Sequence, residues 1–169
     1  DGKDIPGCVK NGIPAEKAEK IFDEMTDFAK YAFNKSHSVC YAVVGYQTAW
    51  LKRYYPVEFM AALMTSVMDK ADKVSGYVEE CKKMGIALLP PDINEGFGPF
   101  SVSEGKIRFG LSAIKNVGSS AVASLVQERE KNGPFQSMTD FCGRMDGGEW
   151  NKRSIESLIK AGAMDSLGG

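Results

Sequence analysis

A chain of 169 residues with 43% hydrophobic and 25% charged residues has the composition of a globular protein with one core or two small ones, which excludes a disordered tail. No stretch approaches about eighteen uncharged apolar residues and no basic-then-apolar leader is present, so the sequence predicts no membrane partner and no secretion, and we expect a cytoplasmic protein. The formal net charge of −1 excludes a protein that coats nucleic acid over its whole surface and leaves room only for a local basic patch.

The four cysteines and the single histidine argue against a zinc site or a disulfide framework. No two cysteines form a C-x-x-C pair, and only His37 is available to complete a metal site. We therefore predict no metal-binding residue and no cofactor, and we expect the cysteines to be reduced, small, buried hydrophobes. They are Cys8, Cys40, Cys81 and Cys142.

The N-terminal 13 residues, DGKDIPGCVKNGI, are rich in Gly, Pro and Asn and predict a loop with Asn11-Gly12 as a turn. Pro14 suits the first turn of a helix, because its missing amide hydrogen would have no partner there. Apolar residues then recur at helical spacing and predict an amphipathic helix. Its apolar positions are Ala18, Ile21, Phe22, Met25, Phe28 and Ala32.

The stretch over residues 28–56 has the most regular apolar periodicity in the chain. Five apolar or aromatic residues recur at steps of three or four and line one face of a helix about four turns long. Pro56 ends that helix, because proline disfavours helical geometry in the residue before it. Ser36 or Ser38 is the expected N-cap. The residues of the face are Val39, Val43, Tyr46, Trp50 and Tyr54.

The start of this helix predicts a phosphate-binding site at Asn34, Lys35, Ser36 and His37. A lysine at the positive end of a helix is unfavourable by roughly 0.3–1 kcal/mol, so its presence favours an anionic ligand there. Exposed amides, hydroxyls, an ammonium and an imidazole are what phosphate oxygens need. The residues also fit a structural reading, in which Lys35 is solvated and His37 packs on Tyr41.

Two further helices follow Pro56. The first, over residues 57–68, is apolar around most of its circumference and is expected to be buried on more than one side. The second carries Val74, Val78 and Cys81 on one face and ends at Gly85. The apolar run at residues 86–89 predicts a strand, and Pro90-Pro91 then forces an extended segment. We place a domain boundary here, between residues 1–88 and 89–169.

The second predicted domain begins with a small β-hairpin. Phe100-Ser101-Val102 and Ile107-Arg108-Phe109 alternate in polarity around a turn that contains Gly105. Next come a short helix with Leu111 and Ile114, a tight turn at residues 116–118, and a second helix. An apolar-x-x-apolar segment, a Gly-apolar-Gly turn and a helix form the pattern of a helix-hairpin-helix motif, whose turn amides bind a DNA phosphate without reading bases.

This copy departs from that pattern because Asn116 stands where the first glycine is usual. Asparagine tolerates left-handed backbone geometry better than most residues but less freely than glycine. An ordinary pair of helices that touches no DNA is the alternative for this segment. The predicted DNA-binding residues are Lys115, Asn116, Gly118, Ser119 and Ser120.

After these helices, residues 133–142 begin with a turn, and residues 151–160 predict a last amphipathic helix. Lys152 and Arg153 either meet phosphate or form a solvated basic face. We predict no catalytic residue. The acidic pairs of the chain sit beside polar helix faces, and Ser36 and His37 are too close in sequence to form a hydrolytic triad.

The sequence contains the runs FNKSH, YQTAWLK and YPVEFMAA at residues 33–37, 46–52 and 55–62. The runs F-N-K-S-H, Y-Q-T-A-W-L-K and Y-P-x-E-F-M-A-A occur in this order in the fingers of the C-family bacterial replicative polymerases, the α subunits of DNA polymerase III, and the chain resembles that family. The resemblance covers nearly the whole chain. It continues through VEECKKMGIALLPPDIN, KIRFGLSAIKNVG, GPFQSMTDFC and NKRSIESLIKAGAMDSLG.

The resemblance implies a mainly α fragment of a longer polymerase. We also expect a fragment because the sequence begins at Asp1, without methionine. Residues 1–88 would be the end of the fingers, and residues 89–169 a β-hairpin with a helix-hairpin-helix module that holds duplex DNA. The catalytic aspartates and their magnesium would belong to a palm domain upstream, so this fragment alone would be inactive. In the parent enzyme, Lys35 and His37 would approach the triphosphate of the deoxynucleotide or the template backbone, and other replisome subunits such as the sliding clamp would be partners.

Two alternatives remain open from the sequence. One is a stand-alone helix-hairpin-helix DNA repair protein. The other is an interaction module of the replisome that bridges polymerase to clamp or loader without touching DNA. Salt-sensitive binding to duplex DNA would separate the second from the polymerase reading, because phosphate contacts release counterions.

Overall fold

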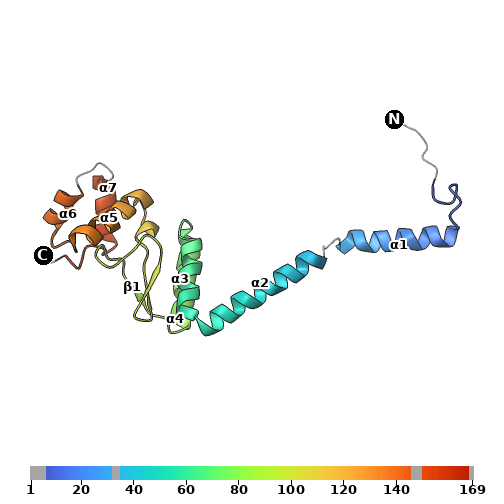
Figure 1. Cartoon of the computed structure of the whole chain (residues 1–169), viewed down its shortest axis with the longest axis horizontal. Coiled ribbons are helices and arrows are strands. Elements are labelled where there is room, and N and C mark those ends of the chain that lie inside the picture. Colours follow the sequence, from blue (N-terminus) through green and yellow to red (C-terminus); the bar gives the residue numbers. More distant parts are fainter. Residues whose placement is uncertain (1–6, 32–34, 146–149, 168–169) are drawn as a thin grey trace, which may run out of the picture. The chain divides into compact units, whose positions relative to one another are not determined.

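The computed structural model describes residues 7–31, 35–145 and 150–167, and over these ranges the fold is mainly α with one small sheet, as predicted (Figure 1). Along the chain, the helices and strands follow one another in a simple order. They are α1 (Ala15–Tyr31), α2 (Lys35–Tyr54), α3 (Pro56–Ser66), α4 (Ala71–Lys83), β1 (Leu88–Leu89), β2 (Ser101–Ser103), β3 (Lys106–Arg108), the 3-10 helix η1 (Leu111–Ala113), α5 (Ser119–Asn132), α6 (Met138–Arg144) and α7 (Lys152–Lys160).

The chain divides into two compact units, Asp1–Thr48 and Ala49–Gly169. We call them the N-terminal unit and the C-terminal unit. The domain boundary predicted at the extended segment after residue 88 lies within the C-terminal unit. The assignment of residues 1–88 and 89–169 to two functional domains stays a prediction.

The N-terminal unit consists of a loop, α1 and most of α2. Gly12 has a φ of +83°, which confirms the predicted Asn11-Gly12 turn. Both predicted helices are present, but none of the described side chains of this unit is buried. The predicted N-cap is wrong: α2 already begins at Lys35, so Ser36 and Ser38 lie inside its first turns.

The C-terminal unit begins at Ala49, within the last turns of α2, and continues into α3. Pro56 is the first residue of α3, where its missing amide hydrogen costs nothing. Met60, Ala61 and Met64 are buried on α3, which confirms the predicted core role of this helix. After α4 the chain turns at Gly85, whose φ of +73° suits a glycine at a helix end.

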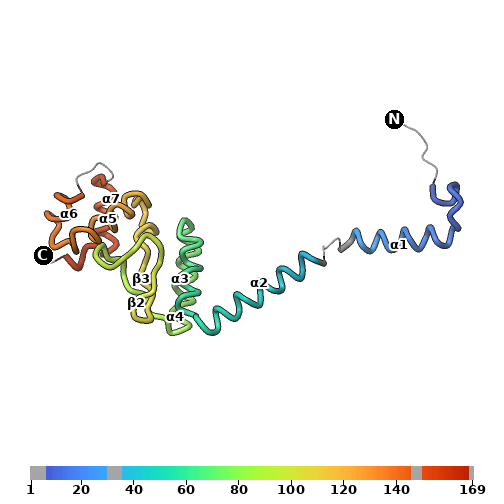
Figure 2. Tube along the Cα trace, in the orientation of Figure 1, coloured from blue at the N-terminus to red at the C-terminus, as the bar shows by residue number. Residues whose placement is uncertain are grey.

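The sheet has three short strands in the order β1-β3-β2. β2 and β3 form the predicted antiparallel hairpin, and Glu104 and Gly105 make its turn with φ values of +50° and +72°. β1 pairs in parallel with β3, so the strand predicted at residues 86–89 joins the hairpin. In Figure 2, β2 and β3 run side by side between α3 and the helices α5, α6 and α7.

Two apolar clusters form the core of the C-terminal unit. The first joins α3 and α4 to the hairpin through residues such as Met64, Cys81 and Ile107. The second joins η1, α5, α6 and α7. Hydrogen bonds from two backbone amides connect residues 93–100 to the elements on either side. The Phe100 amide donates to Thr65 Oγ1 on α3 (3.1 Å), and the Ile93 amide donates to the Ala163 carbonyl after α7 (2.9 Å).

The prediction that all four cysteines are buried is wrong for three of them. Cys8, Cys40 and Cys142 are exposed, and Cys81 alone is buried. Two of the exposed cysteines belong to the N-terminal unit, where no side chain with described burial is buried, and the third lies on an exposed position of α6. Burial raises the pKa of the Cys81 thiol and disfavours its thiolate.

Candidate nucleic-acid interface

The turn between η1 and α5 is anchored by its apolar residues and presents its polar ones to solvent. Ile114 and Val117 are buried in the second cluster, and the Val117 amide donates to the Ile114 carbonyl (3.2 Å). The polar residues of the turn are exposed. The structure therefore brings together all five residues predicted to bind DNA, which are Lys115, Asn116, Gly118, Ser119 and Ser120.

Gly118 is the N-cap of α5 and leaves the start of that helix uncapped by any side chain. Its backbone is extended, with φ of −77° and ψ of 144°, a conformation open to any residue. A Cβ built at this position would meet only Ser120 Oγ, at 3.9 Å. The fold itself therefore does not require glycine here, and the bare backbone leaves room for a ligand to approach the first amides of α5.

Asn116 takes the left-handed conformation that its place in the motif demands, with a φ of +67°. Its amide Nδ2 donates to Ser157 Oγ on α7 (3.1 Å), and Ser157 Oγ donates in turn to the Arg153 carbonyl (2.9 Å). The turn is therefore formed as predicted despite the missing glycine. The asparagine side chain adds a link to α7 that a glycine would not supply.

The start of α7 is fixed by a capping box. Asn151 Oδ1 accepts from the Ser154 amide (3.0 Å), and Ser154 Oγ accepts from the Asn151 amide (3.0 Å). Lys152 and Arg153 on this first turn are exposed. Ser157 lies one helical turn after Arg153. Its hydrogen bond with Asn116 therefore connects the basic first turn of α7 to the turn at residues 116–118.

A buried arginine, which the sequence analysis missed, holds α5 against the segment before the hairpin. Arg129 Nη1 donates to the Ile93 carbonyl (2.8 Å), and its guanidinium lies 4.8 Å from the centre of the Phe97 ring. Burial lowers the pKa of Arg129 below its usual value. Arg129 has no sequence signal beyond its position on the apolar side of a helix, four residues after Leu125.

A second arginine binds the C-terminal end of α5. Arg144 on α6 pairs with Glu128 (2.9 Å) and Asp140 (3.2 Å), donates to the Gly133 carbonyl (2.8 Å), and lies over the Phe135 ring. A hydrogen bond from Asn132 and then one from Arg144 lower the pKa of Glu128. The Gln136 amide, followed by Arg144, lowers the pKa of Asp140. The two ends of α5 therefore differ in charge. The carboxylates of Glu128 and Asp140 lie near its C-terminal end, away from the turn at residues 116–118.

The predicted phosphate site at the start of α2 is described only in part. Asn34 lies outside the described residues, and Lys35 is described as the first residue of α2 without its side chain. Ser36 and His37 are exposed, and the ring centre of His37 lies 4.4 Å from that of Tyr41, one turn on. The contact between His37 and Tyr41 fits the structural interpretation, in which the imidazole packs on the tyrosine ring, and His37 is exposed to solvent.

Within the described ranges, no three His, Cys, Asp or Glu side chains are placed to hold a metal ion together. No helix over those residues has the length and apolar character needed to cross a membrane.

Comparison with known proteins gives a consistent result. Residues 85–169 match the family described as the helix-hairpin-helix motif. The chain is 53% identical over 163 residues to DNA polymerase III subunit alpha of Vibrio cholerae and 52% identical over 163 residues to that of Escherichia coli K12. It is 49% identical over 164 residues to that of Deinococcus radiodurans. These alignments cover 96–97% of this chain and only 12–14% of the relatives.

Proposed function

The chain belongs to the helix-hairpin-helix family, and we propose that it is a segment of a bacterial replicative DNA polymerase which holds duplex DNA by its backbone. Its similarity to DNA polymerase III subunit alpha over 96% of its length supports the polymerase part of this proposal. The exposed turn before α5 supports the DNA-binding part. The chain spans about 14% of the length of these relatives, so the polymerase activity belongs to a longer protein.

The proposed phosphate contact is made by the first amides of α5. The first amides of a helix have no partner within it, and their dipoles sum to a partial positive charge. Gly118, the N-cap residue, offers no capping side chain to the amides of residues 119–121, so these amides can bind a phosphate oxygen. Lys115 adds a cation from the same turn. Contacts of this kind fix the position of a duplex and carry no information about base sequence.

The single observation that carries this proposal is the space at Gly118. Since a Cβ would meet no atom closer than 3.9 Å, Gly118→Ala is expected to fold, yet it places a methyl group where the phosphate approaches. We expect the affinity for a duplex, measured by fluorescence anisotropy, to fall at least about tenfold, which corresponds to 1.4 kcal/mol.

Gly143→Ala is the matched control for that experiment. Gly143 is exposed on α6, and a Cβ there would meet nothing within 4 Å. We expect it to leave affinity unchanged. Equal affinities of Gly118→Ala and the native chain for two duplexes of unrelated sequence would contradict a phosphate contact at this turn. No binding of either duplex by the native chain would favour a module that binds only other proteins.

We further propose that Lys35, Ser36 and His37 bind phosphate in the longer enzyme, either of the incoming deoxynucleotide or of the template. Their position at the start of α2 and the exposure of Ser36 and His37 support this role. In the longer polymerase, Lys35→Ala and His37→Ala are expected to raise the KM for deoxynucleotide or to lower kcat. If both parameters are unmoved, the residues are structural only.

The chemistry of synthesis is proposed to lie elsewhere in the longer protein. By resemblance to the family, we propose that the metal-binding aspartates and magnesium lie in a palm domain, where one metal ion would activate the attacking hydroxyl and both would stabilise the phosphate in the transition state. The present chain would then synthesise no DNA by itself. Duplex DNA and deoxynucleotide are its proposed ligands, the sliding clamp is a proposed partner of the longer protein, and the cytoplasm is the proposed compartment.

A further inference from the structure

The side of α7 that meets the turn before α5 carries two exposed cations. Arg153, Ser157 and Lys160 follow one another at helical spacings of four and three residues and therefore share one side of α7. Arg153 and Lys160 are exposed, and Ser157 is partly exposed. Because Ser157 Oγ accepts from Asn116 Nδ2 (3.1 Å), this side of α7 lies next to the turn. We call Arg153, Ser157 and Lys160 together the α7 basic face.

Both cations of the α7 basic face are available to a ligand. Within the described ranges, no ion pair involves Arg153 or Lys160. Glu156 stands three residues after Arg153 and four before Lys160, and it is exposed without an ion pair to either of them. A guanidinium binds phosphate through two parallel hydrogen bonds, and an ammonium binds it as a point charge. The α7 basic face therefore has the donors that a phosphate backbone needs.

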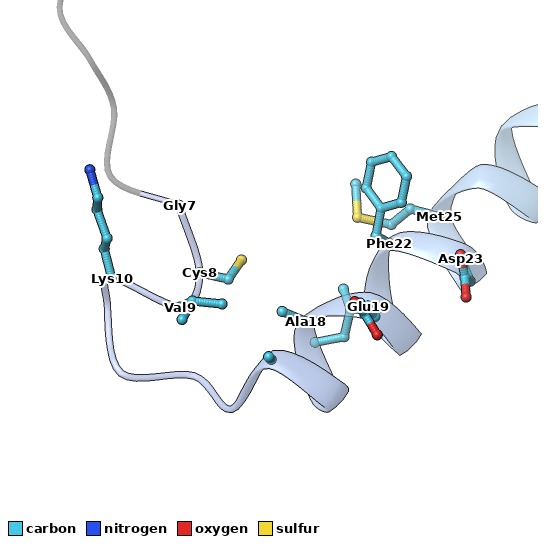
Figure 3. A pocket seen from close by; sticks show the side chains of 11 residues that line it. Gly7, Cys8, Val9, Lys10, Ala18, Glu19, Phe22, Asp23 and Met25 are labelled. Atoms are coloured by element: carbon cyan, nitrogen blue, oxygen red, sulfur yellow. The ribbon is translucent and has the colours of Figure 1, made fainter.

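The groove between the N-terminal loop and α1 provides a contrast in charge. This open groove has a volume of about 900 Å³ and a mostly apolar lining (Figure 3). Its charged lining residues are Lys10 on the loop and Glu19 and Asp23 on α1, so carboxylates outnumber cations there. The C-terminal end of α5 likewise carries two carboxylates. The charged members of the α7 basic face are both cations, and a polyanion is favoured there over the other two places.

We propose that the α7 basic face is a second contact surface for the backbone of the duplex, with Arg153 and Lys160 each contacting a phosphate. This inference rests on the proposed function, in which the duplex is bound at the turn before α5. Arg153 and Lys160 are seven residues apart, which corresponds to about 10 Å along a helix. Since a DNA strand carries one charge per about 3.4 Å of helix axis, side chains this far apart contact different phosphates.

Asn116 is the positioning residue of this second surface. A glycine would take the φ of +67° without strain but would have no side chain to bond Ser157. The bond from Ser157 Oγ to the Arg153 carbonyl (2.9 Å) orients the hydroxyl that accepts from Asn116. The two bonds hold the α7 basic face beside the turn before DNA binds, which lowers the cost of ordering on binding. The asparagine thus has a role that the usual glycine of the motif could not perform.

The salt dependence of duplex binding tests the two cations against a control on the same helix. Anisotropy titrations of the native chain from about 50 to about 200 mM salt give the slope of log affinity against log salt concentration. Arg153→Gln and Lys160→Gln are each expected to reduce the magnitude of this slope by about 0.9, and both together by about 1.8. The control is Lys152→Gln, an exposed cation that precedes Arg153 by one residue and does not share its side of α7. We expect the control to leave the slope unchanged.

Native slopes in Arg153→Gln and Lys160→Gln, or an equal reduction in Lys152→Gln, would overturn the inference. If Lys115→Ala still reduces the slope in that case, the contact at the turn before α5 stands and the second surface alone is lost. Duplex binding by the native chain that does not respond to salt would overturn the inference and the proposed function together.

Asn116→Gly separates positioning from contact. It removes no charge, so the slope should keep its native value, whereas loss of the bond to Ser157 is expected to lower affinity at least about threefold. Ser157→Ala removes the same bond from the other side, and the two changes together should cost no more than either one alone. Ser75→Ala, at an exposed serine of α4, is the control and should bind as the native chain does. Native affinity in both Asn116→Gly and Ser157→Ala would contradict the positioning role of Asn116.

Discussion

The N-terminal unit and the C-terminal unit contain helices of the same amphipathic kind, but only the second buries its apolar residues. Phe22 and Phe28 on α1 are 69% exposed, whereas Phe141 on α6 is fully buried among residues from η1, α5 and α7. The comparison shows that periodicity determines where a helix forms and which face is apolar. Burial depends in addition on whether another element is present to cover that face.

The largest expected effect is a loss of stability when a phenylalanine is replaced by alanine in the C-terminal unit but not in the N-terminal unit. Phe141→Ala removes a ring that contacts Phe135 and Trp150, at centroid distances of 5.1 and 5.6 Å, and is expected to destabilise the C-terminal unit by about 3–5 kcal/mol. Phe28→Ala removes an exposed ring and is expected to change the stability of residues 1–169 by less than about 0.5 kcal/mol.

Chemical denaturation of the two variants and the native chain measures both values. A loss of several kcal/mol from Phe28→Ala in residues 1–169 would mean that α1 packs against a surface within this chain. That result would remove the contrast between the two units.

The next largest expected effect is the stability lost with the hydrogen bonds and ion pairs of Arg144 in the C-terminal unit. Arg144→Met keeps an apolar stem over Phe135 but loses the bonds to Glu128, Asp140 and the Gly133 carbonyl. We expect a loss of about 1–3 kcal/mol, measured by thermal denaturation. The control is Lys131→Met at the same end of α5, an exposed cation for which no change is expected. Equal effects of the two substitutions would show that these bonds add nothing.

A smaller effect is expected at the turn before α5. Asn116→Ala loses the bond to Ser157 and strains a backbone with φ of +67°, which together cost about 1–2 kcal/mol. Asn116→Gly loses the same bond but relieves the strain, so its stability should stay within about 1 kcal/mol of the native chain. Differential scanning calorimetry gives both values, and a glycine variant less stable than the alanine variant would contradict the left-handed geometry of this turn.

The smallest effect is a dependence of stability on pH. The pKa values of Glu128 and Asp140 are lowered in the folded chain, so their contribution is complete above the unfolded pKa of about 4 and is lost as the pH falls through the lower folded values. The denaturation midpoint of the native chain should therefore decrease as the pH falls below about 4, and it should decrease less steeply in Arg144→Met. Parallel curves would contradict the pairing.

The sequence predicts those features that depend on neighbours along the chain. The helices other than α6, the β2–β3 hairpin, the Gly85 stop and the left-handed turn at Asn116 follow from local spacing and backbone preference. The short helix α6 was not predicted, because residues 133–142 were interpreted only as the start of a turn. The contacts of Arg129 with Ile93 and of Asn116 with Ser157 do not, because each joins positions that only the folded chain brings together. Burial of Cys40 was predicted wrongly for the same reason: an apolar pattern does not reveal what covers it.

The central claim is that the turn before α5 binds DNA phosphates, and the salt dependence of duplex binding tests it most directly. Log affinity should fall linearly with log salt concentration, and each phosphate contact contributes a slope of about −0.9. We predict that Lys115→Ala reduces the magnitude of the slope by about one contact, whereas Lys131→Ala at the opposite end of α5 leaves it unchanged. Identical slopes for the native chain and Lys115→Ala, or binding that does not respond to salt, would contradict the claim.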